Sequence, residues 1–147
     1  MKISEVMARD AKLAKPNDTV QQAAKLMKDC DCGVLPVADG DRLVGMITDR
    51  DIAVRCVAEG KGPDAKVRDA MTEEVKYCFE DEEVSHVCEN MSEIQVRRLP
   101  VMDRNKRLVG IVSLSDLAHK QATKAAKALH GITKVSGQHN QSHAAAR

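Results

Sequence analysis

The chain contains the same segment twice, and this internal repeat constrains the fold more than any other feature of the sequence. Leu35-Pro36-Val37 recurs 64 residues later as Leu99-Pro100-Val101. The second copy then gains one residue, so that Leu43-Val44-Gly45 recurs as Leu108-Val109-Gly110. A single insertion in a regular register is typical of a loop. Any fold of this chain must therefore use one structural unit twice.

Each copy predicts the order strand, helix, strand, strand, helix. The helix prediction rests on apolar residues spaced three and four apart, which form one buried face; they are Val20, Ala23, Ala24 and Met27 in the first copy and Val84, Val87, Cys88 and Met91 in the second. Asp18 and Gln21 predict the N-terminal cap of the first helix. The expected ranges are strands over 11–15, 34–37, 43–47 and 76–79, and closing helices over 50–59 and 115–129. The predicted fold class is α/β (α+β), with two β-α-β-β-α repeats packed face to face by a pseudo-twofold axis, because one such unit buries too little surface alone.

The expected domain organisation follows the two copies. Residues 1–60 form repeat 1, residues 61–66 a Gly-rich linker, and residues 67–131 repeat 2 with an extended last helix. Asp39-Gly40 predicts a tight turn between two strands. Residues 132–147 are polar and without periodicity, which predicts a disordered tail. His139 and His143 are four residues apart there, but too few other ligands accompany them to predict a metal site.

Composition excludes several classes of function. The net charge is +1, with 23 basic and 22 acidic residues, so no overall field favours a nucleic acid or a membrane surface. Aromatic residues make up 1% of the chain, which removes the stacking platforms that single-stranded nucleic acids use. No apolar run approaches the span of a bilayer, and we expect a cytoplasmic protein.

The five cysteines are expected to be reduced thiols. Cys56 and Cys88 fall on apolar helix faces, and Cys32 precedes a predicted buried strand, where a free cysteine acts as a small hydrophobe. Cys30-Asp31-Cys32 lacks the spacing of a thioredoxin-like or zinc motif. A redox role of the cysteines is kept as an alternative.

A polar signature ends the third predicted strand of each copy. It reads Gly45-Met46-Ile47-Thr48-Asp49-Arg50-Asp51 in the first and Gly110-Ile111-Val112-Ser113-Leu114-Ser115-Asp116 in the second. The pattern places a hydroxyl at a strand end and a carboxylate in the first turn of a helix, where outward N–H groups favour anions. Each site alone is explained by helix capping. The recurrence of both at fixed distances from Gly and Leu-Pro-Val favours a ligand-binding role.

These motifs resemble the CBS domains, named after cystathionine β-synthase, which occur in tandem pairs. The resemblance covers about residues 2–120 and rests on Leu-Pro-Val, Leu-Val-Gly and the final Thr/Ser-x-x-Asp in both copies. The chain is similar to stand-alone bacterial CBS-pair proteins. The resemblance implies adenosyl ligands held between the repeats, namely AMP, ADP, ATP or NAD, with S-adenosylmethionine ranked below them and no required cofactor or metal.

The resemblance also implies two composite clefts. Cleft 1 would use Met46, Thr48, Asp51, Lys76, Tyr77, Arg98 and Pro100. Cleft 2 would use Lys12, Leu13, Val34, Pro36, Arg50, Ile111, Ser113 and Asp116. The Asp of each cleft would accept ribose hydroxyls, and Arg98 would hold phosphate. Val34, at the position that corresponds to Arg98, cannot pair with phosphate, although Arg50 could compensate. We therefore expect cleft 1 to bind phosphorylated ligands more tightly.

Four further expectations concern function. The sequence has no nucleophile–base set, metal cluster or phosphate loop, so we expect no catalytic activity. A regulatory module that signals to an unidentified effector protein is the favoured interpretation. A ligand-free interaction or scaffold module is the main alternative. The small apolar residues of the last helix, Ala118, Ala122, Ala125 and Leu129, predict a homodimer.

Overall fold

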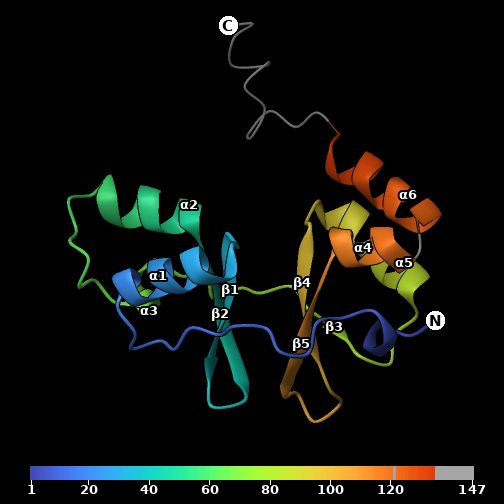
Figure 1. Cartoon of the computed structure of the whole chain (residues 1–147), viewed down its shortest axis with the longest axis horizontal. Coiled ribbons are helices and arrows are strands. Elements are labelled where there is room, and N and C mark those ends of the chain that lie inside the picture. The colour runs from blue at the N-terminus through green and yellow to red at the C-terminus, as the bar shows by residue number, and fades with distance from the viewer. Residues whose placement is uncertain (121, 135–147) are drawn as a thin grey trace, which may run out of the picture.

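The structure is a computed structural model that describes residues 1–120 and 122–134, and it contains two similar α+β units side by side (Figure 1). The first half of the chain forms the 3₁₀ helix η1 (Ile3–Glu5), α1 (Val20–Cys30), β1 (Val34–Asp39), β2 (Arg42–Thr48), α2 (Asp49–Ile52) and the π-helical η2 (Ala53–Val57). The second half forms α3 (Val67–Ala70), β3 (Cys78–Phe79), α4 (Val84–Ile94), β4 (Arg98–Met102), β5 (Leu108–Ser113), α5 (Leu114–Lys120) and α6 (Ala122–Ile132). The predicted α+β class with two repeats is confirmed. Below, repeat 1 means the β1–β2 hairpin with α1, α2 and η2, and repeat 2 means β3–β5 with α4–α6.

A β-hairpin is the centre of each repeat. β1 pairs antiparallel with β2, and β4 pairs antiparallel with β5, with Val37 opposite Gly45 and Val101 opposite Gly110. Gly40 turns the first hairpin with a φ of 64°, as Asp-Gly predicted. The predicted first strands are shorter than expected. Residues 11–15 make only an isolated parallel bridge from Ala14 to Val37, and the second copy keeps only the two residues of β3.

The short segment that precedes each repeat packs into the core of the other repeat. Ile3 and Val6, at the start of the chain, are buried against Leu99 and Val101 of repeat 2. In the same way, Val67 and Ala70 of α3 are buried in the core of repeat 1, with Leu35 and Val37. Each apolar pair is therefore buried in the core of the repeat that it does not directly precede. The expected division of the chain at residues 60 and 67 stays a prediction.

The N-terminus of α1 is capped one residue later than predicted. Thr19 Oγ1 accepts a hydrogen bond from the N–H of Gln22 at 3.1 Å, and the Gln22 side chain accepts one from the N–H of Thr19 at 2.8 Å. This is a reciprocal capping box. Asp18 instead accepts from the N–H of Lys15 through its carboxylate, which stabilises the preceding turn. The predicted Asp18–Gln21 pair was therefore wrong by one position.

The helix expected over residues 115–129 is two helices, α5 and α6. The change of direction lets α6 pack against α4, and it buries Ala125 and Ala128 in the core of repeat 2. Gly131 makes this contact close, because a Cβ at that position would collide with the side chain of Ser92. One continuous helix could not return to α4 in this way.

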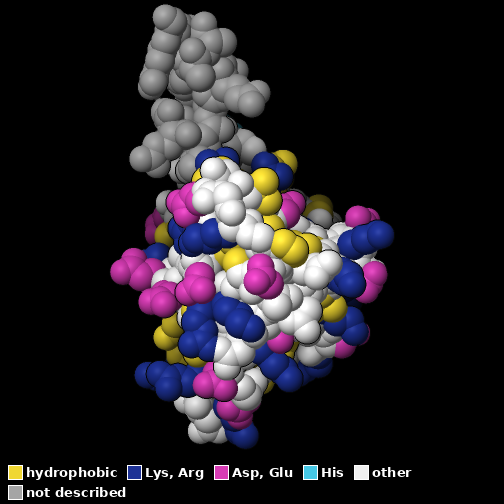
Figure 2. Space-filling view, turned by 90° about the vertical axis from the view of Figure 1, so that its left-hand side faces the viewer, with side chains coloured by type: hydrophobic (Ala, Val, Ile, Leu, Met, Phe, Trp, Pro, Cys, Tyr) yellow, Lys and Arg dark blue, Asp and Glu magenta, His cyan; other side chains and the backbone are white. Residues whose placement is uncertain are grey.

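The surface carries both signs of charge. Figure 2 shows Lys and Arg side chains interspersed with Asp and Glu on one face of the molecule. This pattern agrees with the net charge of +1. Within the part of the chain that the structure describes, no helix is both long enough and apolar enough to span a membrane. The predicted disordered tail, with His139 and His143, lies outside the described residues apart from its first three positions.

Candidate functional site

The polar signature of repeat 1 forms a reciprocal cap at the start of α2. Asp51 N–H donates to Thr48 Oγ1 at 3.0 Å, and Thr48 N–H donates to Asp51 Oδ2 at 2.9 Å. The Asp51 side chain is 16% exposed, and its Oδ1 lies 4.0 Å from Nε of Arg55. That arginine also donates to the carbonyls of Ala70 and Met71, at 3.2 and 3.0 Å. The carboxylate thus caps its helix with one oxygen and faces a guanidinium with the other.

Repeat 2 builds the same pair at the start of α5. Ser113 N–H and Ser113 Oγ both donate to Asp116 Oδ2 at 2.9 Å, and Asp116 N–H donates to Ser113 Oγ at 3.2 Å. The helix-capping interpretation of the signature is therefore correct in both copies. It does not exclude ligand binding, because a carboxylate offers more acceptor sites than the cap uses.

The glycine of each signature has a separate role. Met46, next to Gly45, exchanges two backbone hydrogen bonds with Thr72, and Ile111, next to Gly110, exchanges two with Ala8. A Cβ on Gly110 would lie 2.5 Å from the carbonyl oxygen of Ala8, and one on Gly45 would lie 2.9 Å from that of Thr72. Glycine is needed because the segment leading into the opposite repeat crosses the strand at this point.

A cavity of about 450 Å³ opens between the start of the repeat 2 hairpin and its closing helices. Arg98 and Ser113 are cross-strand partners and both line it. The neighbouring backbone is tied by a hydrogen bond of 2.9 Å from Leu114 N–H to the Arg97 carbonyl. The polar lining residues are Arg97, Arg98, Ser113 and Ser115, and the apolar ones are Leu114, Ala118, Ala122, Ala125, Ala126 and Leu129. Two guanidinium groups and two hydroxyls beside an apolar wall suit a ligand with an anionic end and an apolar body.

Repeat 1 has a related cavity with a different lining. Its volume is about 410 Å³, and it lies at the end of α1. Gly33 and Asp49 line it, and they correspond to Arg97 and Leu114 in repeat 2. The same hydrogen bond recurs, from Asp49 N–H to the Gly33 carbonyl at 3.0 Å. The remaining lining residues are Ala24, Met27, Lys28, Asp31, Cys32 and Ile52. With two carboxylates and one ammonium group, this cavity lacks the positive charge of its counterpart.

Apart from Asp51 and Asp116, which lie in the first turns of α2 and α5, the predicted site residues fall into two groups. The first group lies on the hairpins, where each residue faces a partner in its own repeat. These cross-strand pairs are Val34–Thr48, Pro36–Met46, Arg98–Ser113 and Pro100–Ile111. The second group lies on exposed segments, either ahead of the strands or on α2, and consists of Lys12, Leu13, Arg50, Lys76 and Tyr77. Arg98 and Ser113, expected in different clefts, thus line one cavity, and the assignment of residues to two composite clefts stays a prediction.

Tyr77 is placed between the repeats. It lines a cavity of about 260 Å³ together with Arg42 and Leu43 of repeat 1 and Met102 of repeat 2. Its ring packs edge-on against Phe79, with the ring centroids 5.6 Å apart. Tyr77 thus lies beside residues of both repeats, but none of the cleft 1 hairpin residues lines this cavity, and the place of Tyr77 in cleft 1 stays a prediction.

The apolar wall of the repeat 2 cavity was not predicted as part of a site. The spacing of Ala118, Ala122, Ala125 and Leu129 predicts one helical face, which was expected to make a dimer contact, and all four residues line this cavity. Sequence periodicity identifies an apolar face but does not say what covers it. The placement of α5 and α6 beside Arg97 and Arg98 was the missing information.

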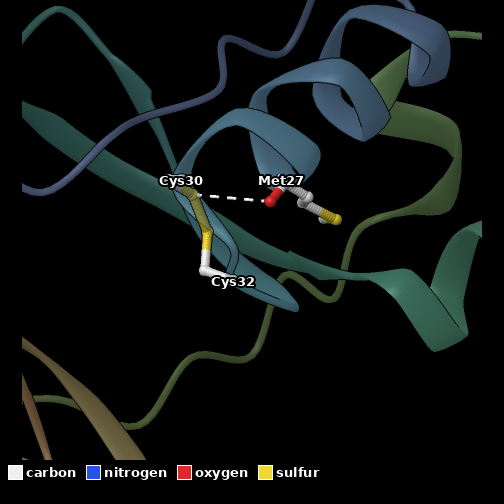
Figure 3. The surroundings of a disulfide bond; sticks show 3 residues. All are labelled: Met27, Cys30 and Cys32. Atoms are coloured by element: carbon white, nitrogen blue, oxygen red, sulfur yellow. Dashed lines mark hydrogen bonds between the residues drawn. A yellow bond between two sulfur atoms is a disulfide. The ribbon is translucent and has the colours of Figure 1, made fainter.

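The cysteines differ from expectation at two positions. Cys30 and Cys32 form a disulfide, so the prediction of five reduced thiols was wrong for this pair (Figure 3). Their side chains meet because the residue between them, Asp31, ends α1 in the left-handed conformation. Cys56, Cys78 and Cys88 are buried, as predicted for core thiols. Among the described residues, no three His, Cys, Asp or Glu side chains are grouped so as to hold a metal ion.

Comparison with known proteins identifies the family. Residues 3–57 and 67–123 each match the CBS domain, so the chain belongs to the CBS domain family and carries a tandem pair. It is 41% identical over 137 residues to the uncharacterized protein YlbB of Bacillus subtilis, covering 90% of this chain and 92% of YlbB. It is 37% identical over 136 residues to the CBS domain-containing protein YhcV of the same organism, covering 92% and 96%. These relatives consist of little beyond the matched pair.

A solved structure extends the comparison to ligands. The CBS domain pair of protein MJ0100, in complex with 5-methylthioadenosine and S-adenosyl-L-methionine, superimposes with a TM-score of 0.73 at 30% identity. The match covers 84% of this chain and 98% of that one. A CBS pair of this fold thus accommodates adenosyl compounds in that protein.

Proposed function

We propose that this protein is a regulatory module that binds an adenosyl nucleotide and holds its phosphate with Arg98. The observation that carries the proposal is the repeat 2 cavity, which combines Arg98 with the hydroxyls of Ser113 and Ser115. A guanidinium group donates two parallel hydrogen bonds to a phosphate, and the Ser115 hydroxyl supplies a further donor, since the hydroxyl of Ser113 already donates to Asp116. The wall formed by α5 and α6 offers an apolar surface for the base.

The proposed ligand class is AMP, ADP, ATP or NAD. The adenosyl part is supported by the MJ0100 pair, whose complex contains two adenosyl compounds. The phosphate part is supported by the two arginines of the cavity. The ribose would be held by a carboxylate oxygen that the helix cap leaves available, from Asp116 or, in the composite arrangement of cleft 1, from Asp51. We propose no catalytic role, because the contacts proposed for the ligand bind it without reacting with it.

The other functional expectations stay predictions. They are the homodimer, the effector protein that reads the bound state, and the cytoplasmic location. A ligand-free interaction module remains the alternative function.

Calorimetric titration with AMP and adenosine tests the proposal. We expect Arg98→Ala to weaken AMP binding about tenfold, which corresponds to about 1.4 kcal/mol, while adenosine affinity stays the same. Arg97→Ala is the matched control, since it removes the neighbouring guanidinium and is expected to have the smaller effect. Equal losses for AMP and adenosine would contradict phosphate binding by Arg98. Absence of heat with every adenosyl compound at millimolar concentration would favour the ligand-free alternative.

A double-mutant cycle identifies the carboxylate that shares the ligand with Arg98. Asp51→Ala and Asp116→Ala each remove a helix cap, so each variant first needs a thermal unfolding measurement. Coupling of Arg98→Ala with Asp116→Ala in AMP affinity would support a site within repeat 2, and coupling with Asp51→Ala would support the composite cleft.

A further inference from the structure

The disulfide between Cys30 and Cys32 closes the end of α1 and forms part of an accessible cavity wall. Both cysteines are half-buried, and Cys32 lines the cavity of about 410 Å³ with Asp31 and Asp49. The Cα atoms of the two cysteines are 5.4 Å apart. The ring that the bond closes contains only one intervening residue. Because the constraint on the unfolded chain grows with loop length, a ring of this size contributes little to stability.

The corresponding turn in repeat 2 has the same backbone without cysteines. Asp31 has φ 51° and ψ 48°, and Gln95, at the equivalent position, has φ 56° and ψ 46°. The hydrogen bonds also correspond, since Cys32 N–H donates to the Met27 carbonyl at 3.0 Å and Val96 N–H donates to that of Met91 at 3.1 Å. The helix end therefore determines this turn, and the disulfide is not required to form it. The chain can accept the dithiol form with its backbone unchanged.

The reduced form also has a partner for one thiol. Sγ of Cys30 lies 3.8 Å from the carbonyl oxygen of Met27, within reach of a thiol hydrogen bond (Figure 3). A disulfide sulfur has no hydrogen to donate, whereas the thiol does. Cys32 lies on the open side, in the cavity wall. Cys32 thus lines a cavity that a reagent from solution can enter, whereas Cys30 is not among the residues that line it.

The remaining cysteines are almost wholly buried, although Cys88 lines a cavity of about 300 Å³. Cys56, Cys78 and Cys88 are 1%, 2% and 5% exposed. Burial, with a smaller contribution from the charge of Glu82, raises the pKa of the Cys78 thiol to about 12. The thiolate is the reactive form, so Cys78 is unreactive near neutral pH. Thiol chemistry in the native protein is therefore directed to Cys30 and Cys32.

We propose that Cys30 and Cys32 form a reversible thiol–disulfide site that exchanges with low-molecular-weight disulfides, with Cys32 as the attacking cysteine. The Cys32 thiolate attacks one sulfur of the disulfide RSSR, forms a mixed disulfide and releases one RS⁻. The Cys30 thiolate then attacks Sγ of Cys32, closes the intramolecular bond and releases the second RS⁻. The protein dithiol is oxidised to the disulfide while RSSR is reduced to two thiols, and the reverse sequence regenerates the dithiol.

The experiment uses the full chain, reduced with dithiothreitol, separated from the reductant and then exposed to glutathione disulfide. Quenching with N-ethylmaleimide in denaturant, followed by intact mass and peptide mapping, reports every free thiol. We expect wild type to lose the mass of two hydrogen atoms and to leave only Cys30 and Cys32 unlabelled. Cys30→Ser is expected to stop at one glutathione adduct on Cys32, and Cys32→Ser to react more slowly at Cys30. Reduced glutathione should restore five labelled thiols in wild type.

A matched variant tests whether the backbone conformation of the turn is enough for two cysteines to exchange with glutathione disulfide. Ile94→Cys with Val96→Cys, in a chain that also carries Cys30→Ser and Cys32→Ser, moves the cysteine pair to the equivalent turn of repeat 2. We expect it to form the disulfide with glutathione disulfide as wild type does. The proposal is overturned if wild type keeps five labelled thiols at every glutathione ratio, or if the disulfide resists reduced glutathione. These two measurements use wild type alone, so a variant that fails to fold leaves the test intact.

Discussion

In repeat 1 the hairpin begins with Gly33 and Val34, whereas in repeat 2 the corresponding residues are Arg97 and Arg98. The backbone around them is the same, because each first residue accepts a hydrogen bond from the start of the next helix. Only the side chains differ, and they give the two cavities different charges. The comparison teaches that the CBS fold determines where a cavity forms, while a few side chains decide which ligand charge it suits.

The largest expected effect concerns the feature that the repeats share. Gly110→Ala should destabilise the protein by about 2–3 kcal/mol, because its Cβ would meet the Ala8 carbonyl, which belongs to a paired backbone. Gly45→Ala should cost less, since its Cβ would lie 2.9 Å from the Thr72 carbonyl oxygen instead of 2.5 Å from that of Ala8, and its nearest obstacle is the flexible side chain of Met71. Thermal and urea unfolding measure both variants. Gly62→Ala is the control, because it would meet only an exposed Asp64 side chain. Equal stability of the Gly110 and Gly62 variants would contradict the close crossing of the two segments.

The next effect comes from giving repeat 1 the positive charge that repeat 2 carries at the corresponding position. Val34→Arg places a guanidinium opposite Thr48, as Arg98 lies opposite Ser113. We expect a second AMP-binding event or up to about tenfold tighter AMP binding, because a charge-assisted hydrogen bond contributes on the order of 1.4 kcal/mol. Adenosine affinity should change little. Calorimetry with both ligands measures this, and Val34→Gln, which has a polar but uncharged side chain, is the control.

The result also separates two explanations of the difference between the repeats. If Val34→Gln strengthens AMP binding as much as Val34→Arg, then polarity rather than charge matters at this position. If neither variant changes AMP binding, the cavity of repeat 1 has no phosphate subsite, and the difference between the repeats extends beyond residues 34 and 98.

Local patterns predicted most of the secondary structure. Val84, Val87, Cys88 and Met91 are all buried on one face of α4, as their spacing indicated. Such periodicity records which side of a helix is apolar, and this is a property of neighbouring residues. Ala24 is the exception, since it belongs to the predicted face of α1 but is exposed. It lines the open cavity at the end of that helix.

Contacts between distant segments were not predictable in the same way. The apolar character of Ile3 and Val67 was visible, but the core that each joins depends on how the repeats are placed. The capping role of Asp51 and Asp116 followed from local spacing, whereas the meeting of Arg98 with the α6 face depended on where α6 packs on repeat 2. The Cys30–Cys32 bond depended on a left-handed residue that cysteine spacing alone does not indicate.

The repeats also differ at the hairpin turn, where repeat 1 has Asp39-Gly40 and repeat 2 has Asp103-Arg104-Asn105-Lys106. Three carboxylates in repeat 2 have a pKa below the usual range, for different reasons. A hydrogen bond from Arg104 lowers the pKa of Asp81, backbone hydrogen bonds and Arg107 lower that of Asp103, and Lys2 with the N-terminus lowers that of Glu83. Arg104 makes two hydrogen bonds to Asp81 through Nε and a third through Nη2 at 2.7 Å, and its guanidinium lies 4.0 Å from the ring centroid of Phe79.

The smallest expected effect is a loss of acid stability when the Arg104–Asp81 pair is broken. The folded pKa of Asp81 is lowered, so its contribution to stability is present above the unfolded pKa of about 3.9 and is lost as the pH falls through the folded value. Arg104→Gln should raise the pKa of Asp81 and move the acid-unfolding midpoint slightly toward higher pH. The shift should be small and should shrink in high salt, because both groups are exposed and an exposed ion pair is screened.

NMR titration of the Asp81 carboxyl and circular dichroism between about pH 2 and 6 measure both quantities across the range that these pKa values define. Arg42→Gln, at the exposed start of β2, is the control from repeat 1. If Asp81 titrates at the same pH in the Arg104 variant as in wild type, the guanidinium is not the cause of its lowered pKa, and this difference between the repeats has another origin.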